Sequence, residues 1–324
     1  MMQAVGYGAD PRIRWTEWLP WLAAVAVFFL LPEYLSLGAR ILVFILFALS
    51  LDLVTGYAGV ITLGHSAFFG LGAYVAGILA AKFGITDPLL LLAAAALAAG
   101  VLGIATGAVI LRTHGLTQLM LTLAIAAVCL EIANKATPIT GGADGLSGIK
   151  IDPIFGAFRF DLFGRTAYVY CLITLFCGWW LVRRIIYSPF GATLTGIREN
   201  GVRMHAIGVP VYRRLVIAYT VSAMIAGVAG ALLTQTNQFV GLNVLGFEPS
   251  GELLVMLILG GVGRIYGAFV GPLVFMIAQD QLAKQFPEYW YLGIGLILVL
   301  VVMFARGGIL GIIDGLIARF RRRA

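Results

Sequence analysis

The sequence predicts an all-α polytopic membrane protein, a transmembrane bundle of about eight to ten helices with two glycine-rich helix breaks. Of the 324 residues, 61% are hydrophobic and only 11% are charged, less than half of the ~25% that is typical of soluble domains. This balance is also the opposite of that in a disordered chain, which needs low hydrophobicity and high net charge. A membrane β-barrel is excluded because its strands alternate apolar and polar residues, whereas the apolar runs here are continuous and rich in Ala and Leu.

Stretches without charged residues place the membrane crossings. Residues 88–111 would rise roughly 36 Å as a helix, enough for a hydrocarbon core of ~30 Å. The short run 252–261 ends in Gly260 and Gly261, and we expect a broken helix buried against other helices, because irregular backbone cannot face lipid. The full set of expected crossings is about 18–31, 38–51, 66–83, 88–111, 115–132, 166–182, 215–234, 252–261, 265–283 and 289–305.

The arginines indicate the orientation of the chain. Six lie from Arg183 to Arg214 against a single acidic residue, Glu199, and four more follow Arg306. By the positive-inside rule both regions face the cytoplasm. A nucleic-acid partner is excluded because such basic arms bind as solvated segments, and these are held between membrane spans. The predicted organisation is a cytoplasmic segment 1–17, a transmembrane domain 18–305 with an external loop 133–165 and a cytoplasmic loop 183–214, and a basic cytoplasmic tail 306–324.

Two glycine clusters, residues 56–74 and 259–272, interrupt the apolar runs. One interpretation is a small-residue seam that lets helices approach closely. The other is a pair of discontinuous helices beside a substrate path. We favour the second because each cluster also carries a polar or charged residue. The residues assigned to the helix breaks are Gly64, Gly70, Gly72, Gly260, Gly261 and Gly263.

Few strongly polar side chains fall within or at the ends of the apolar runs. They are Asp52, His65, Glu131, Asn134, Glu252 and Arg264. A charge in the bilayer costs roughly 2.5–3.5 kcal/mol on the insertion scale, so such a residue normally faces inward. The candidates for a translocation path are His65, Ser66, Glu131, Glu252 and Arg264. His65 has an alternative role as a hydrogen-bonded packing residue, and Glu131 and Glu252 as structural anchors near helix ends.

The sequence lacks motifs for catalysis or metal binding. None of the four lysines follows a glycine, so there is no Walker A motif. The three cysteines show neither paired spacing nor a neighbouring His cluster. We therefore predict a protein that is not an enzyme, with no catalytic residue, no metal site and no cofactor bound by this chain.

Seven short motifs follow one another between Ala48 and Leu310. They are Gly-Tyr-Ala-Gly at 56–59, Leu-Gly-His-Ser-Ala-Phe-Phe-Gly-Leu-Gly-Ala-Tyr at 63–74, Thr-Gly-Gly-Ala-Asp-Gly-Leu at 140–146, Ser-Pro-Phe-Gly at 188–191, Ile-Arg-Glu-Asn at 197–200, Leu-Gly-Gly-Val-Gly at 259–263 and Phe-Ala-Arg-Gly-Gly-Ile-Leu-Gly at 304–311. Any one alone is weak, but together and in this order they are specific. On these motifs the chain resembles the permease subunits of branched-chain (hydrophobic) amino acid ABC importers.

The resemblance implies a set of partners in the bacterial inner membrane. These are a homologous second permease subunit in a heterodimer, two cytoplasmic ATP-binding subunits that use ATP and Mg²⁺, and a periplasmic substrate-binding protein. The family usually has an acidic residue and then two alanines in its coupling helix, where this chain has Gly201, Arg203 and Met204. Arg264 stands where the family commonly has Ser or Thr. By resemblance, coupling to the ATPases falls on Arg198, Glu199, Asn200, Ala206 and Gly208.

The sequence leaves the substrate open. The resemblance implies branched-chain or other hydrophobic amino acids, moved inward by alternating access. Arg264 and the positive ends of broken helices favour a carboxylate in general. The alternatives are aromatic or other small carboxylates, urea or sugars carried by a related ABC permease. An ion-coupled secondary transporter is less favoured, because acidic residues are scarce in the expected core.

Overall fold

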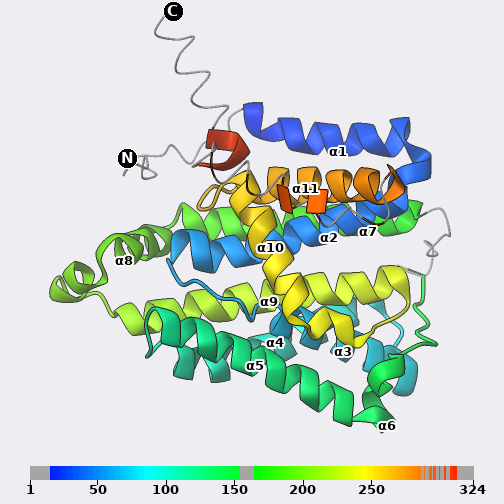
Figure 1. The fold of residues 1–324 in the computed structure, drawn as a ribbon, viewed down its shortest axis with the longest axis horizontal. Coiled ribbons are helices and arrows are strands. Elements are labelled where there is room, and N and C mark those ends of the chain that lie inside the picture. The colour runs from blue at the N-terminus through cyan, green and yellow to red at the C-terminus, as the bar shows by residue number, and fades with distance from the viewer. Residues whose placement is uncertain are drawn as a thin grey trace, which may run out of the picture.

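A computed structural model describes residues 15–153 and 164–285, and within the C-terminal stretch residues 288, 292, 293, 295, 296, 299, 303 and 307–311. The described chain is a helical bundle (Figure 1). Its regular structure is helical, and an isolated antiparallel bridge pairs Leu146 with Val240. The predicted all-α bundle is confirmed.

Eleven α-helices lie within the described ranges, and nine of them overlap an expected crossing, whereas Thr137–Thr140 and Pro189–Ala206 lie in expected loops. The N-terminal ones are α1 (Leu19–Leu30), α2 (Leu35–Asp52), α3 (Ser66–Lys82), α4 (Pro88–Ile110), α5 (Leu116–Lys135) and the four-residue α6 (Thr137–Thr140). The later ones are α7 (Arg165–Ile186), α8 (Pro189–Ala206), α9 (Val211–Asn237), α10 (Phe247–Gly260) and α11 (Gly267–Gln285). Most of the crossing expected at 289–305 lies outside the described residues.

Among the described residues, five segments are long and apolar enough to cross a membrane. They are Pro32–Tyr57, Pro88–Ile110, Leu116–Lys135, Arg165–Ile186 and Val211–Asn237. Helices α1 and α3 are apolar but shorter. The short helix expected at 252–261 is present as α10, which begins earlier, at Phe247.

The core lies where α2 and α9 run through the bundle. Helix α2 is buried continuously from Ile41 to Asp52, as expected of a helix that is apolar on all sides. Helix α9 packs backbone to backbone against α3, because a Cβ on Gly72 would lie 2.6 Å from the carbonyl carbon of Gly227. In contrast, α4 and α5 expose rows of large apolar side chains, as lipid-facing helices do.

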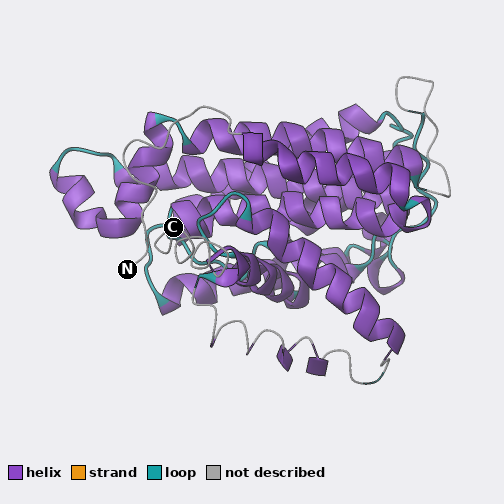
Figure 2. Ribbon diagram, turned by 90° about the horizontal axis from the view of Figure 1, so that it is seen from above, coloured by secondary structure: helices purple, strands orange, loops and turns teal. Residues whose placement is uncertain are grey.

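The two ends of the bundle carry different structures. Helix α8 projects from one end, which we call the α8 end, and α6 lies at the opposite end (Figure 1). Figure 2 shows the same projection from a second direction. At the α8 end, a largely buried ion pair joins Arg183 to Glu17. At the α6 end, Lys82 donates a hydrogen bond to the carbonyl of Pro138.

Candidate functional site: the junction of two helix breaks

The first helix break begins where α2 changes its winding. After Asp52 the chain forms one π-helical turn, η3 (Leu53–Tyr57), and then runs without regular structure until α3 begins at Ser66. π-Turns are rare and frequently occur at functional sites. Gly59 in this segment has a φ of +75°, a conformation that favours glycine.

The second break separates α10 from α11. Helix α10 ends at Gly260, and Gly261 and Gly263 follow with φ values of +114° and +76°. The backbones are in direct contact here, because a Cβ on Gly260 would lie 2.8 Å from the amide nitrogen of Gly271. The three glycines assigned to this break therefore lie in it or at its edge.

The prediction for the first break is wrong for two of its three glycines. Gly64 precedes α3, but Gly70 and Gly72 lie inside α3. Their role is close packing, since a Cβ on Gly70 would lie 2.5 Å from Leu245 Cγ. Residues 56–65 of the glycine cluster therefore form the break between two helices. Residues 66–74 belong to α3, where the glycines form a seam of close packing.

The two breaks meet each other at the end of α2. Asp52 Oδ1 accepts a hydrogen bond of 2.7 Å from the backbone N–H of Gly263, and the Asp52 side chain is buried. Its other oxygen, Oδ2, has no hydrogen-bond partner in the described part of the chain. A Cβ on Gly56 would lie 2.6 Å from the Gly263 nitrogen, so the approach needs glycine. Sequence reasoning noted Asp52 as an intramembrane polar residue but did not assign it to the site.

Arg198 from α8 completes this arrangement. Its Nη1 donates a hydrogen bond to the carbonyl oxygen of Gly56, and its guanidinium interacts electrostatically with Asp52. Its aliphatic stem covers Gly59, where a Cβ would lie 2.7 Å from Arg198 Cγ. We call the group Asp52, Gly56, Arg198 and Gly263 the break junction.

His65 is buried and contacts α2 at Ser50, two residues before Asp52. Its Nε2 is 2.9 Å from Ser50 Oγ and 3.4 Å from Ser222 Oγ, and its ring stacks on Phe47 with 5.6 Å between centroids. Both serine hydroxyls donate to backbone carbonyl oxygens, of Phe47 and of Ser50. The Nε2 is therefore the donor to Ser50 Oγ. These contacts match the packing role that the sequence left open for His65.

Ser66 begins α3 inside the bundle. Its backbone N–H donates to Ser250 Oγ at 2.8 Å, and its own hydroxyl lies 3.5 Å from the carbonyl oxygen of Leu245. Because the first N–H groups of a helix have no partner within it, a hydroxyl from α10 satisfies one of them here.

The other path candidates lie apart from this cluster. Glu131 is exposed near the end of α5 and pairs with Lys135 at 3.3 Å. Glu252 is half-buried on α10, and the half-buried Arg264 follows Gly263 directly in the second break. Of the predicted path residues, the neighbours His65 and Ser66 therefore lie at the start of α3, and Arg264 lies next to the break junction.

Helix α8 is two helical pieces joined at Asn200. Ser188 caps its start by accepting a 3.4 Å hydrogen bond from Gly191 N–H, with Pro189 in the first helical turn. Asn200 has a φ of −158°, and its Oδ1 accepts a hydrogen bond of 2.9 Å from Arg203 N–H, so it caps the second piece. Gly208, with a φ of +87°, ends it.

The end of α8 is a Schellman motif. The N–H of Gly208 bonds to the carbonyl of His205 at 3.0 Å and that of Val209 to the carbonyl of Met204 at 3.1 Å. Between the two caps, Val202 and Ile207 are largely exposed. All five residues assigned to ATPase coupling are exposed on this projection. The side chain of one of them, Arg198, also reaches the break junction.

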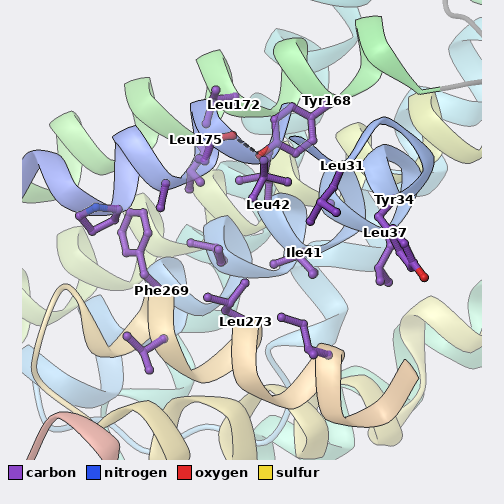
Figure 3. A pocket seen from close by; sticks show the side chains of 18 of the residues that line it. Leu31, Tyr34, Leu37, Ile41, Leu42, Tyr168, Leu172, Leu175, Phe269 and Leu273 are labelled. Atoms are coloured by element: carbon purple, nitrogen blue, oxygen red, sulfur yellow. Dashed lines mark hydrogen bonds between the residues drawn. The ribbon is translucent and has the colours of Figure 1, made fainter. Parts of the chain in front are cut away.

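A separate cavity of about 590 Å³ lies between α1 and the layer formed by α2, α7 and α11. Figure 3 shows its apolar lining, with Ile41 and Leu42 facing Leu172, Phe269 and Leu273. None of the predicted path residues lines it. Over the described ranges, no cluster of three or more His, Cys, Asp or Glu could hold a metal ion.

Comparison with known proteins places this architecture in a family. Residues 34–302 match the model of the branched-chain amino acid transport system permease component. The chain is 26% identical over 290 residues to the high-affinity branched-chain amino acid transport system permease protein LivM of Escherichia coli K12, covering 83% of this chain and 68% of that one.

Proteins named LivH are also similar. Identity is 25% over 286 residues to LivH of the same strain, covering 82% of this chain and 90% of the relative. It is 26% over 278 residues to a probable LivH of Methanocaldococcus jannaschii, covering 81% and 84%. No solved structure gives a significant match. The chain therefore belongs to the family of permease components of branched-chain amino acid transport systems.

Proposed function

We propose that this chain is a membrane-spanning subunit of an ABC importer that moves branched-chain or other hydrophobic amino acids inward. The observation that carries this proposal is the family match, which extends from residue 34 to residue 302 and includes both helix breaks and α8. The multi-pass bundle agrees with this role.

The proposed complex contains this chain, a homologous second permease subunit, two ATP-binding subunits and a periplasmic substrate-binding protein. The similarity to both LivM and LivH proteins supports a pair of related permeases. Helix α8 supports a contact with the ATPases, because it is capped at both ends, stands out from the bundle and exposes Val202 and Ile207. ATP and Mg²⁺ would be used by those partners.

The proposed orientation puts the α8 end in the cytoplasm at the inner membrane. The ion pair between Glu17 and Arg183 holds the N-terminal segment at the same end as the arginine-rich loop. That loop has the charge bias of a cytoplasmic loop. Segments 1–17 and 306–324 would then face the cytoplasm and the 133–165 loop the outside.

Alternating access is the proposed mechanism. A helix break can act as a hinge, because a few residues in it can absorb the φ and ψ changes that reorient the two helical segments. Both breaks of this chain adjoin the proposed cytoplasmic end, where ATP-driven movement of α8 would begin.

Reconstitution tests this function. The chain is co-expressed with the second permease, the ATPases and the binding protein of its transport system, and the complex is placed in liposomes. We expect ATP-dependent uptake of labelled leucine, with benzoate, urea and a sugar as competing substrates that test the alternatives. Solute accumulation by the purified chain alone, driven by an ion gradient without nucleotide, would overturn the proposal.

A further inference from the structure

Three segments that are far apart in the sequence converge on the break junction. They are the end of α2 with its π-turn, the turn between α10 and α11, and α8. Each is joined to the next by one directed contact: Gly263 N–H to Asp52 Oδ1, and Arg198 Nη1 to the carbonyl of Gly56.

The three segments approach one another so closely at the junction that its glycines leave no room for a side chain. A Cβ on Gly263 would lie 3.0 Å from Arg198 Nη1 and 3.2 Å from the Gly56 oxygen. A Cβ on Gly59 would lie 3.1 Å from Arg198 Cβ. Segments that approach this closely are expected to move together, because closely packed groups have low compressibility.

We propose that Arg198 is the positioning residue that ties α8 to both helix breaks, so that a movement of α8 displaces the two breaks together. Arg198 holds the first break through the Gly56 carbonyl, and Asp52 transfers that position to the second break through Gly263. The proposal rests on the proposed function in that the partner moving α8 is an ATPase. It goes beyond that function by assigning to Arg198 a role directed into the membrane domain.

The chemistry of the side chain fits this role. A guanidinium offers five N–H donors in a fixed fork, so one arm can hold a carbonyl while the charge compensates a nearby carboxylate. Asp52 Oδ2 is buried and has no hydrogen-bond partner among the described residues. A buried carboxylate of this kind is stabilised by a nearby positive charge. Arg112 is a matched arginine at the same end of the bundle, where it stacks on Tyr212 at 5.8 Å and has no role at the breaks.

Hydrogen–deuterium exchange of the purified chain in lipid nanodiscs tests the tie directly. The variant R198M keeps the stem over Gly59 and removes the donor, whereas R198A removes both. We expect either variant to raise amide exchange by about tenfold in residues 53–65 and also in residues 258–266, as the loss of a hydrogen bond to a charged group predicts. R112A should leave both segments as in the unsubstituted chain.

The segments in which amide exchange increases decide whether Arg198 has this role. If R198M changes exchange only in residues 197–208, or nowhere, the proposal is overturned. If R198A fails to fold, which rapid exchange in α4 and α9 would reveal, R198M alone gives the answer. D52A removes the acceptor of the Gly263 N–H and should also raise amide exchange in residues 258–266.

A second measurement uses the whole complex trapped with ATP and vanadate. In the unsubstituted complex, trapping should alter exchange in α8 and in both breaks together, and in R198M it should alter α8 alone. If trapping altered amide exchange in α8 and in both breaks of R198M, Arg198 would not be the residue that connects them. If trapping leaves α8 unaffected even without substitution, the ATPase contact itself fails, while the nanodisc result still decides the role of Arg198.

Discussion

Asp52 Oδ1 and the backbone N–H of Gly263 are hydrogen-bonded at 2.7 Å across 211 positions of sequence. Replacing Asp52 by Asn retains an acceptor of the same shape, whereas Ala leaves a buried N–H without a partner, which costs about 1–3 kcal/mol. We expect D52A to lower the thermal unfolding midpoint in detergent and D52N to lower it less. D280N is the control, because Asp280 pairs with Lys284 at the surface. Equal losses for D52N and D52A would show that this hydrogen bond does not stabilise the fold.

Gly56→Ala should separate the two breaks. The added Cβ would lie 2.8 Å from Gly263 Cα, and backbone cannot rotate away as a side chain does. Overpacking of this kind costs about 1–3 kcal/mol. The control is Gly201→Ala, where nothing lies within 4 Å and the helix should gain up to ~1 kcal/mol. Thermal unfolding of the two variants measures the difference, and similar midpoints would contradict the close approach.

His65→Phe should separate packing from transport. Phe preserves the stacking on Phe47 and loses the hydrogen bond to Ser50, a loss of about 1 kcal/mol. If His65 is a packing residue, the variant should be mildly less stable and should transport at a nearly normal rate. Stability is read from thermal unfolding and transport from leucine uptake. Abolished uptake at full stability would instead assign His65 to the path.

Gly208→Ala should disturb the contact with the ATPases and leave membrane insertion intact. Ala at a φ of +87° is strained by about 1–2 kcal/mol, so the Schellman end of α8 should unwind. Co-purification of the ATPases measures the effect, and E199A is expected to weaken it as well. Gly148→Ala is the matched control, since Gly148 has a φ of +78°, an open surrounding and a place outside α8. Full recovery of the ATPases with G208A would count against docking at this end of α8.

Arg264→Ser tests whether a positive charge beside the second break serves the substrate. If the side chain lines the path, the maximal rate of leucine uptake at saturating loaded binding protein should fall several-fold, because the charge that attracts the substrate carboxylate is lost, and R264K should restore part of it. Uptake at the unsubstituted rate would make Arg264 a structural residue.

The sequence predicts the helices well because apolar length and charge are local signals. The expected crossing 88–111 appears as Pro88–Ile110, and 166–182 appears within Arg165–Ile186. Gly208 is a local signal of the same kind, since a glycine just past the last helical residue is typical of a helix end. Gly70 and Gly72 mislead because glycine serves both breaks and close packing, and only the neighbouring helix, here α9, distinguishes the two.

The break junction could not be predicted from the sequence alone. Asp52, Arg198 and Gly263 belong to three segments whose meeting depends on how α2, α8 and α10 pack, which is non-local. The available signals were the position of Asp52 four residues before Gly56 and the presence of an arginine in the loop predicted to be cytoplasmic. Neither signal shows that the arginine side chain returns to the membrane domain.

The buried start of α3 sets an order for biogenesis. The Ser66 N–H finds its partner in Ser250, which the ribosome adds 184 residues later. Without Ser250 this N–H would have no side-chain partner, and an unpaired backbone group in an apolar surrounding costs several kcal/mol. Chains released before α10 is made would therefore be recognisable to membrane quality control as unfinished, whatever the hydrophobicity of the helices already in place.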